Sequence, residues 1–174
     1  GSKSRPVNGQ ECPGQKWMYV SQTIPIPVEN ATPLDLSSLF NANCAKDFDD
    51  DGKEYAAELL PAAGLRRLGS DQVPFNFPGN QPDKNNCVLA AGQQFKLPAN
   101  VNGDTLYLLG ACAKGNHKTR IGFQLTNGRT DFRPFELNDW NGKNHANDEI
   151  GLDFEYRQTP AGRNFIPTKM WIVQ

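Results

Sequence analysis

The sequence has no long hydrophobic run and no excess of one charge, and each absence excludes a class of protein. No apolar stretch in the 174 residues approaches the roughly 20 that cross a bilayer as a helix, so we expect no membrane span. Eighteen basic residues are balanced by nineteen acidic ones, which gives a net charge of -1. Because general nucleic-acid binding needs a cationic surface, this balance argues against a nucleic-acid partner.

Signatures of common enzymes are also missing. The sequence contains no phosphate-binding G-x-x-x-x-G-K-[ST] or G-x-G-x-x-G motif and no G-x-S-x-G nucleophile elbow. None of the four cysteines forms a C-x-x-C pair, which gives a structural zinc site little support. Carboxylates on the later strands could pair for glycoside hydrolysis, but acidic residues on a strand face are usually just solvated. We therefore predict no catalytic residues.

Turn-forming residues are abundant and predict the fold class. Sixteen glycines and thirteen prolines separate short apolar runs, and no βαβ rhythm is visible. Thr119 to Thr126 alternates and is followed by Asn127-Gly128, a strong hairpin signal. The most apolar segment, Thr105 to Ala113, predicts a central strand, and Glu54 to Ala63 predicts one short helix. About nine strands predict an all-β, two-layer antiparallel β-sandwich.

The chain divides into a tail and one domain. Residues 1–16 are polar and rich in Gly and Pro, so we interpret them as a tag plus linker or a loose N-terminal tail. Residues 17–174 predict a single β-sandwich domain. Both ends of this domain carry Trp and β-branched residues, so we expect a strand at Trp17–Ile24 to pair with one at Lys169–Gln174.

The four cysteines permit up to two disulfides, with three possible connectivities. We expect Cys87 and Cys112 on core strands, either as free thiols or as a cross-strand disulfide, with Cys12 and Cys44 as the second pair. Asn30-Ala31-Thr32 matches the glycosylation acceptor pattern, although such triplets often arise by chance. These features favour an extracellular or periplasmic location.

The sharpest local motif is an acidic loop. Residues Asp47, Asp49 and Asp51, with Gly52 and Glu58, satisfy the D-x-D-x-D-G-x5-E calcium-loop pattern. Calcium prefers 6–8 oxygen ligands, and alternate carboxylates converge when such a loop curls. We expect a structural calcium site at these four carboxylates; the alternative is a solvated acidic turn.

A second candidate site surrounds a tryptophan in a polar segment. Sugar rings stack on exposed aromatic side chains while polar neighbours bond their hydroxyl groups, and Trp140 is followed by polar residues. The alternative is that Trp140 closes the end of the sandwich core. The predicted hydroxyl partners are Asn138, Asp139, Asn144 and His145.

Several segments follow one another in a recognisable order. They are DLSSLFN (35–41), DFDDDGKEYAAELLPAAG (47–64), VPFNFP (73–78), PDKNNCVLAAGQQFKLP (82–98), TLYLLGACAKGN (105–116) and NDW (138–140). This ordered set is similar to ancillary β-sandwich modules of secreted glycoside hydrolases. The resemblance implies a jelly-roll, galactose-binding-like sandwich without catalysis of its own, which binds carbohydrate or supports a neighbouring catalytic domain.

The sequence thus predicts a secreted, non-catalytic module whose partners are a polysaccharide or glycan and a neighbouring catalytic domain. Two rivals remain at this point. One is a purely structural domain-docking module without a ligand site. The other is a small enzyme that degrades polysaccharides.

Overall fold

The computed structural model describes residues 31–99, 101, 103–142 and 148–174, and this part of the chain is an all-β protein. It contains ten strands in four sheets, and every pair of neighbouring strands is antiparallel. The predicted fold class is therefore confirmed. The helical turns η1 (Ser37–Leu39) and η2 (Ala57–Leu59) are short 3-10 segments, and no described helix has the length and apolarity to cross a membrane.

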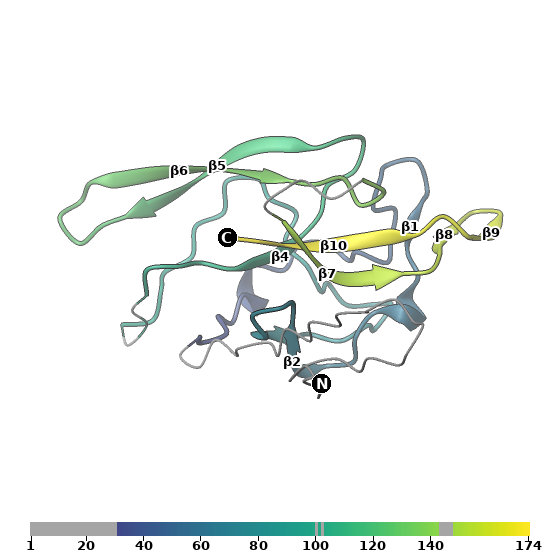
Figure 1. Cartoon of the computed structure of the whole chain (residues 1–174), viewed down its shortest axis with the longest axis horizontal. Helices are drawn as coiled ribbons and strands as arrows, with labels where there is room; N and C mark the ends of the chain where they lie inside the picture. The colour runs from purple at the N-terminus through teal and green to yellow at the C-terminus, as the bar shows by residue number, and fades with distance from the viewer. Residues whose placement is uncertain (1–30, 100, 102, 143–147) are drawn as a thin grey trace, which may run out of the picture.

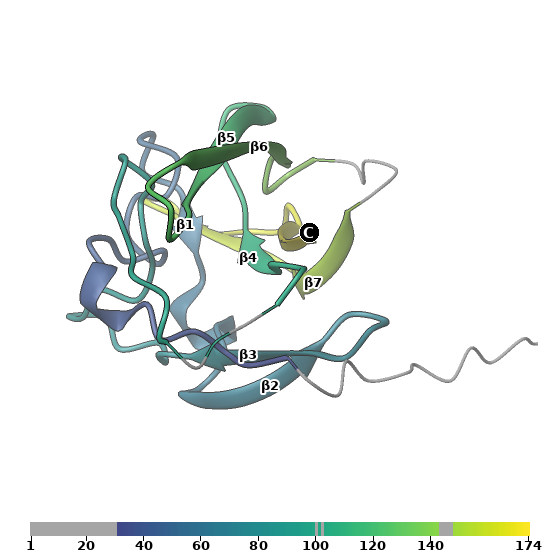
Figure 2. The same ribbon diagram turned by 90° about the vertical axis from the view of Figure 1, so that its left-hand side faces the viewer.

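The strands form two three-stranded sheets and two hairpins. The hairpins lie on opposite sides of the β4–β10–β7 sheet in both views (Figures 1 and 2). One sheet has the order β1 (Glu54–Tyr55), β8 (Arg157–Thr159), β9 (Gly162–Asn164); the other has the order β4 (Leu108–Gly110), β10 (Thr168–Val173), β7 (Glu149–Phe154). The hairpins are β2 (Gly64–Leu68) with β3 (Val73–Phe77), and β5 (His117–Gln124) with β6 (Thr130–Leu137).

Strand β10, and not the segment Thr105–Ala113, is the central strand of its sheet. The predicted central strand shrinks to β4, which lies at the sheet edge, whereas Trp171, Ile172 and Val173 of β10 are all buried. Strand β7 pairs with Thr168–Ile172 and β4 with Trp171–Val173, so Trp171 and Ile172 have a partner on both edges. The pairing with Trp17–Ile24 stays a prediction. Residues 17–24 themselves lie outside the described part of the chain.

The predicted helix over Glu54–Ala63 is also largely absent. The segment begins as strand β1, pairs with β8, and then makes the single 3-10 turn η2. The Tyr55 side chain is fully buried and its hydroxyl donates to the Lys169 carbonyl oxygen at 2.8 Å. Burial of this ring needs an extended backbone here, so tertiary packing overrides helix propensity.

An aromatic cluster forms the core between the β1–β8–β9 sheet and the β7–β10 strands. The Tyr55 ring centroid lies 5.2 Å from that of Phe154, 5.1 Å from that of Trp140 and 4.8 Å from that of Phe48. Cys44 and Leu60 complete the buried cluster. Burial raises the pKa of Tyr55 well above its ordinary value, so this phenol is a neutral hydrogen-bond donor.

The described cysteines form no disulfide. Cys44, Cys87 and Cys112 are free thiols, which is the free-thiol alternative for Cys87 and Cys112, and Cys12, the expected partner of Cys44, lies outside the described residues. Cys87 and Cys112 sit in isolated bridges beyond the regular strands, opposite Ala42 and Asp139 respectively. The Cys112 thiol donates to the carbonyl oxygens of Leu137 and Gly115, at 3.0 and 3.1 Å, whereas Cys87 packs against the core cluster that contains Cys44.

Candidate functional site

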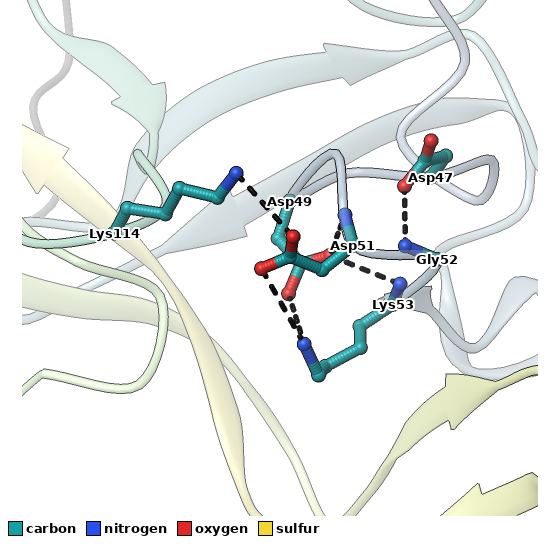
Figure 3. Close-up of polar contacts among 6 residues, drawn as sticks. All are labelled: Asp47, Asp49, Asp51, Gly52, Lys53 and Lys114. Carbon is teal, nitrogen blue, oxygen red and sulfur yellow. Dashed lines mark hydrogen bonds and ion pairs between the residues drawn. The ribbon is translucent and has the colours of Figure 1, made fainter.

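The acidic loop is held together by its own backbone (Figure 3). The Asp47 carboxylate accepts from the Gly52 amide at 2.7 Å. One Asp49 oxygen accepts from the amides of Asp51 and Lys53, at 2.9 and 3.0 Å. These bonds curl the loop as the sequence motif predicts, and Gly52, at φ +77°, supplies the left-handed turn.

Two lysines form ion pairs with two carboxylates of this loop, Asp49 and Asp51. Lys53 Nζ lies 3.1 Å from Asp49 and 3.7 Å from Asp51, and Lys114 Nζ lies 3.6 Å from Asp51 (Figure 3). Burial opposes ionisation of Asp49, but the amides of Lys53 and Asp51 and the Lys53 ammonium outweigh it, so the pKa of Asp49 is lowered. The carboxylate of Asp49 is therefore ionised and already paired at neutral pH.

Glu58, the fourth predicted calcium ligand, has different partners. Its carboxylate accepts from the Tyr156 hydroxyl at 2.8 Å and from the Arg163 guanidinium at 3.2 Å. Hydrogen bonds from its own amide and from Tyr156 lower the pKa of Glu58, and the bond to Glu58 raises the pKa of Tyr156. Glu58 thus fastens η2 to the β8–β9 hairpin.

The described residues bring no three His, Cys, Asp or Glu side chains into a group suited to a metal ion. Calcium binding stays a prediction, and to make it the carboxylates of Asp49 and Asp51 would have to leave the lysines that hold them. The motif predicts the curl of the loop. It does not predict the ion pair between Lys114 and Asp51, because Lys114 is distant from the loop in sequence.

Trp140 is a core residue, and the expectation of an exposed sugar platform at this position is wrong. Its side chain is 1% exposed. The ring packs against Phe48 and Tyr55 at centroid distances of 4.9 and 5.1 Å, and the Arg157 guanidinium lies 5.6 Å from its centroid. This position agrees with the alternative interpretation, in which Trp140 closes the core.

The predicted hydroxyl partners of Trp140 are occupied or undescribed. Asn138 is buried and its side-chain amide donates to Asp148. Asp139 organises a turn: its carboxylate accepts from the amides of Asn141 and Gly115. Asn144 and His145 lie outside the described residues.

The structure places a different aromatic ring on the surface, on the outer face of the β5–β6 hairpin. Phe132 of β6 is 53% exposed and pairs across the hairpin with Gly122 of β5. A Cβ atom on Gly122 would come within 2.9 Å of Phe132 Cε1, so the ring lies in the space that a side chain at position 122 would need. Glycine here lets the ring lie close to the sheet.

Polar side chains surround the Phe132 ring on the same face. The Arg120 guanidinium carbon lies 4.6 Å from the ring centroid, a cation–π contact. The next pair along this face, Gln124 with Thr130, is exposed and adds an amide and a hydroxyl group. Among the described residues Arg120 makes no ion pair, in contrast to Arg133, whose guanidinium lies 2.7 Å from the Asp131 carboxylate. We call Arg120, Gly122, Gln124, Thr130 and Phe132 the hairpin platform.

A second exposed ring, Phe165, has more restricted surroundings. It is 75% exposed and its centroid lies 5.7 Å from that of Tyr156. The neighbouring Arg163 lies over the Tyr156 ring at 4.9 Å and forms an ion pair with Glu58. The polar groups beside Phe165 are therefore engaged with one another, unlike those of the hairpin platform.

Sequence reasoning missed the hairpin platform although a signal was present. The alternation places Ile121, Phe123 and Leu125 on one face and Arg120, Gln124 and Thr126 on the other. Phe132 falls on the polar face once the Asn127-Gly128 turn fixes the register opposite Gly122. An aromatic residue on the polar face of a predicted hairpin is the pattern that would have identified it.

Comparison with known proteins agrees with the fold. The sequence model of the AziU2-like beta-sandwich domain matches residues 21–163, which is most of the chain. No curated protein matches the sequence.

Proposed function

The chain belongs to the AziU2-like β-sandwich domain family, and we propose that it is a non-catalytic carbohydrate-binding module of a secreted carbohydrate-active protein. In this proposal its partners are a polysaccharide or glycan and a neighbouring catalytic domain. The carbohydrate surface is the hairpin platform, in place of the loop around Trp140.

The observation that carries the proposal is the exposed Phe132 ring, which has hydrogen-bonding side chains beside it on the same face of the β5–β6 hairpin. An aromatic ring offers a large rigid apolar area at low entropic cost, which suits the C–H face of a sugar ring. The guanidinium of Arg120, the amide of Gln124 and the hydroxyl of Thr130 stand around it, and donors and acceptors of these kinds recognise hydroxyl groups. A strand face is also rigid, so binding orders few groups.

The charge of Arg120 indicates which class of polysaccharide the platform would bind most tightly. Lys118, on the same face, is held by Glu136 at 3.8 Å, so Arg120 is the platform cation left without a carboxylate among the described residues. A guanidinium stacked on a ring still presents its N–H donors at the edge, where a uronic-acid carboxylate or vicinal hydroxyl groups can accept them. We therefore expect polysaccharides that carry uronic acids to bind more tightly than neutral ones.

Affinity gel electrophoresis on a panel of neutral and uronic-acid polysaccharides tests the proposal. We expect the wild-type protein to be retarded by at least one polysaccharide, and Phe132→Ala to abolish that retardation. Phe165→Ala is the matched control, because it removes an exposed ring of the same kind from a different surface. Retention of binding by Phe132→Ala, at unchanged stability, would place the sugar site elsewhere.

The second candidate function is docking to another protein domain without a sugar ligand. It is favoured by the adjacent exposed residues Phe165 and Ile166, which follow β9 at 75% and 43% exposure. Absence of retardation on every polysaccharide of the panel would favour this structural role.

A further inference from the structure

Two cysteines far apart in sequence meet beside the aromatic core. Ala42 and Cys87 exchange both backbone hydrogen bonds, at 3.2 Å from the Ala42 amide and 3.1 Å from the Cys87 amide. Two residues beyond Ala42, the Cys44 amide donates to the Asn86 side chain at 3.0 Å. The segments around positions 44 and 87 are thus held side by side by several hydrogen bonds.

The side chains of these residues meet at the same core cluster. Cys44 is buried in the core cluster, and Cys87 packs against it while remaining partly exposed. The neighbouring Cys87 side chain, together with burial, raises the pKa of Cys44, and the Cys44 side chain lowers the pKa of Cys87. The accessible partner is therefore the one that ionises first.

We propose that Cys44 and Cys87 are a disulfide site, which a soluble disulfide such as oxidised glutathione converts from two thiols to one covalent cross-link. A disulfide needs the two sulfur atoms at the ~2.05 Å bond length, so the neighbouring side chains must shift toward each other when it forms. Both cysteines lie outside the regular strands, so short connecting segments absorb this shift. The pairing differs from both pairs expected from the sequence.

The reaction runs in two exchange steps. The Cys87 thiolate attacks one sulfur of the soluble disulfide, forms a mixed disulfide and expels one thiolate. Cys44 then loses its proton to solvent and attacks Cys87 Sγ, which expels the second thiolate. The protein gives up two electrons and two protons, and the soluble disulfide is reduced to two thiols.

The cross-link should stabilise the fold. It closes a loop of about 40 residues that contains the acidic loop, β1 and the β2–β3 hairpin, and so restricts the unfolded chain. For a domain of this size we expect the melting temperature to rise by about 5–15 °C on oxidation.

Peptide mapping of the full chain after equilibration with oxidised glutathione tests the site directly. Trypsin places each of the four cysteines on its own peptide, because it cuts after Lys16, Lys46, Lys84, Lys96 and Lys114. We expect alkylation and non-reducing mass spectrometry to show the Cys44 and Cys87 peptides joined, with the loss of two hydrogens. Full alkylation of both, a stable glutathione adduct, or a link of either to Cys12 or Cys112 would overturn the proposal.

Variants separate the cross-link from general effects of oxidation. Cys87→Ala should lose the rise in melting temperature and the linked peptide. Cys112→Ser should keep both, because the Cys112 thiol bonds carbonyl oxygens and no described cysteine. If Cys87→Ala is too unstable to melt cooperatively, the wild-type peptide map alone decides.

Discussion

The Tyr55 hydroxyl donates to the Lys169 carbonyl oxygen at 2.8 Å, across 114 positions of sequence. This bond joins β1, near the start of the described domain, to β10, the central strand near its end. The Trp140 carbonyl oxygen accepts from the Lys169 amide at 2.8 Å, so both backbone groups of Lys169 are bonded to core aromatic residues. The edge of β10 that β4 leaves uncovered is thus closed by Tyr55 and Trp140.

Replacing Tyr55 by Phe should destabilise the fold by about 1–3 kcal/mol, because the ring stays while a buried carbonyl loses its donor. Urea denaturation measures the change in the free energy of unfolding. Tyr107→Phe is the control, since the Tyr107 hydroxyl makes no hydrogen bond among the described residues, and it should cost less than about 0.5 kcal/mol. Equal effects of the two variants would mean that the Tyr55 bond contributes nothing specific.

Local signals in the sequence predict local structure well here. The Asn127-Gly128 turn gives the β5–β6 hairpin, closed by bonds from the Leu125 amide to Arg129 and from the Gly128 amide to Leu125. The acidic motif gives the curled loop, because the Asp47 and Asp49 carboxylates bond amides within five positions. Such contacts depend on spacing along the chain, which a sequence displays.

The errors arise where distant segments decide the outcome. Trp140 is followed by polar residues, yet rings from positions 48 and 55 pack against it. Glu54–Ala63 has helix composition, yet burial of Tyr55 and pairing with β8 extend its first residues. Glu58 completes a calcium motif, yet Tyr156 and Arg163 bind it. These contacts join residues that are far apart in sequence, so neither composition nor local spacing predicts them.

Replacing Trp140 by Ala should reduce the free energy of unfolding by about 3–5 kcal/mol, because it empties a fully enclosed site in the aromatic core. Thermal melting with a tryptophan-independent signal, such as far-ultraviolet circular dichroism, measures the loss. A variant that melts like the wild type would contradict the core assignment and return Trp140 to the list of surface residues.

Acid should weaken the acidic loop through Asp49. The pKa of Asp49 is lowered in the folded protein from its ordinary value of 3.8. The ionised carboxylate therefore stabilises the fold fully at pH values above the pKa that Asp49 has in the unfolded chain. This contribution declines as the pH falls below 3.8 and is lost once the pH passes the folded pKa. Asp49→Asn should therefore flatten the dependence of stability on pH in this acidic range.

Urea midpoints between about pH 2 and 6 measure this effect, which we expect to be about 2 kcal/mol for a carboxylate with several hydrogen bonds. Asp83→Asn is the control, because Asp83 is exposed and makes no ion pair among the described residues. An Asp83→Asn variant that flattens the curve equally would show that general charge, and not the Asp49 bonds, controls the acid response.

If the predicted calcium site forms, calcium should raise the melting temperature of the wild-type protein. We expect the rise to be small, because the ion has to displace Lys53 and Lys114 from Asp49 and Asp51, and because Glu58 is held by Tyr156 and Arg163. Differential scanning fluorimetry with added calcium and with EDTA makes the comparison. A rise with calcium that disappears in Asp49→Asn would confirm the site, and an unchanged melting temperature would contradict it.

The Phe132 ring and Gly122 offer the most specific test of the hairpin platform. A methyl group at position 122 would meet Phe132 Cε1 at 2.9 Å, so Gly122→Ala should push the ring away from the sheet and from Arg120. Because the ring is exposed and can rotate, the free energy of unfolding should change by less than about 1 kcal/mol, while the affinity for the retarding polysaccharide falls about 5-fold or more.

The double variant Gly122→Ala/Phe132→Ala shows whether the effect passes through the ring. With Phe132 already replaced by Ala, the methyl group at position 122 has no ring to displace, so the second substitution should leave any residual affinity unchanged. Affinity electrophoresis of the two single variants and the double variant gives the coupling between the two positions. Losses that simply add would show that Gly122 acts on the ligand independently of Phe132, and the ring would then not be the surface on which the sugar stacks.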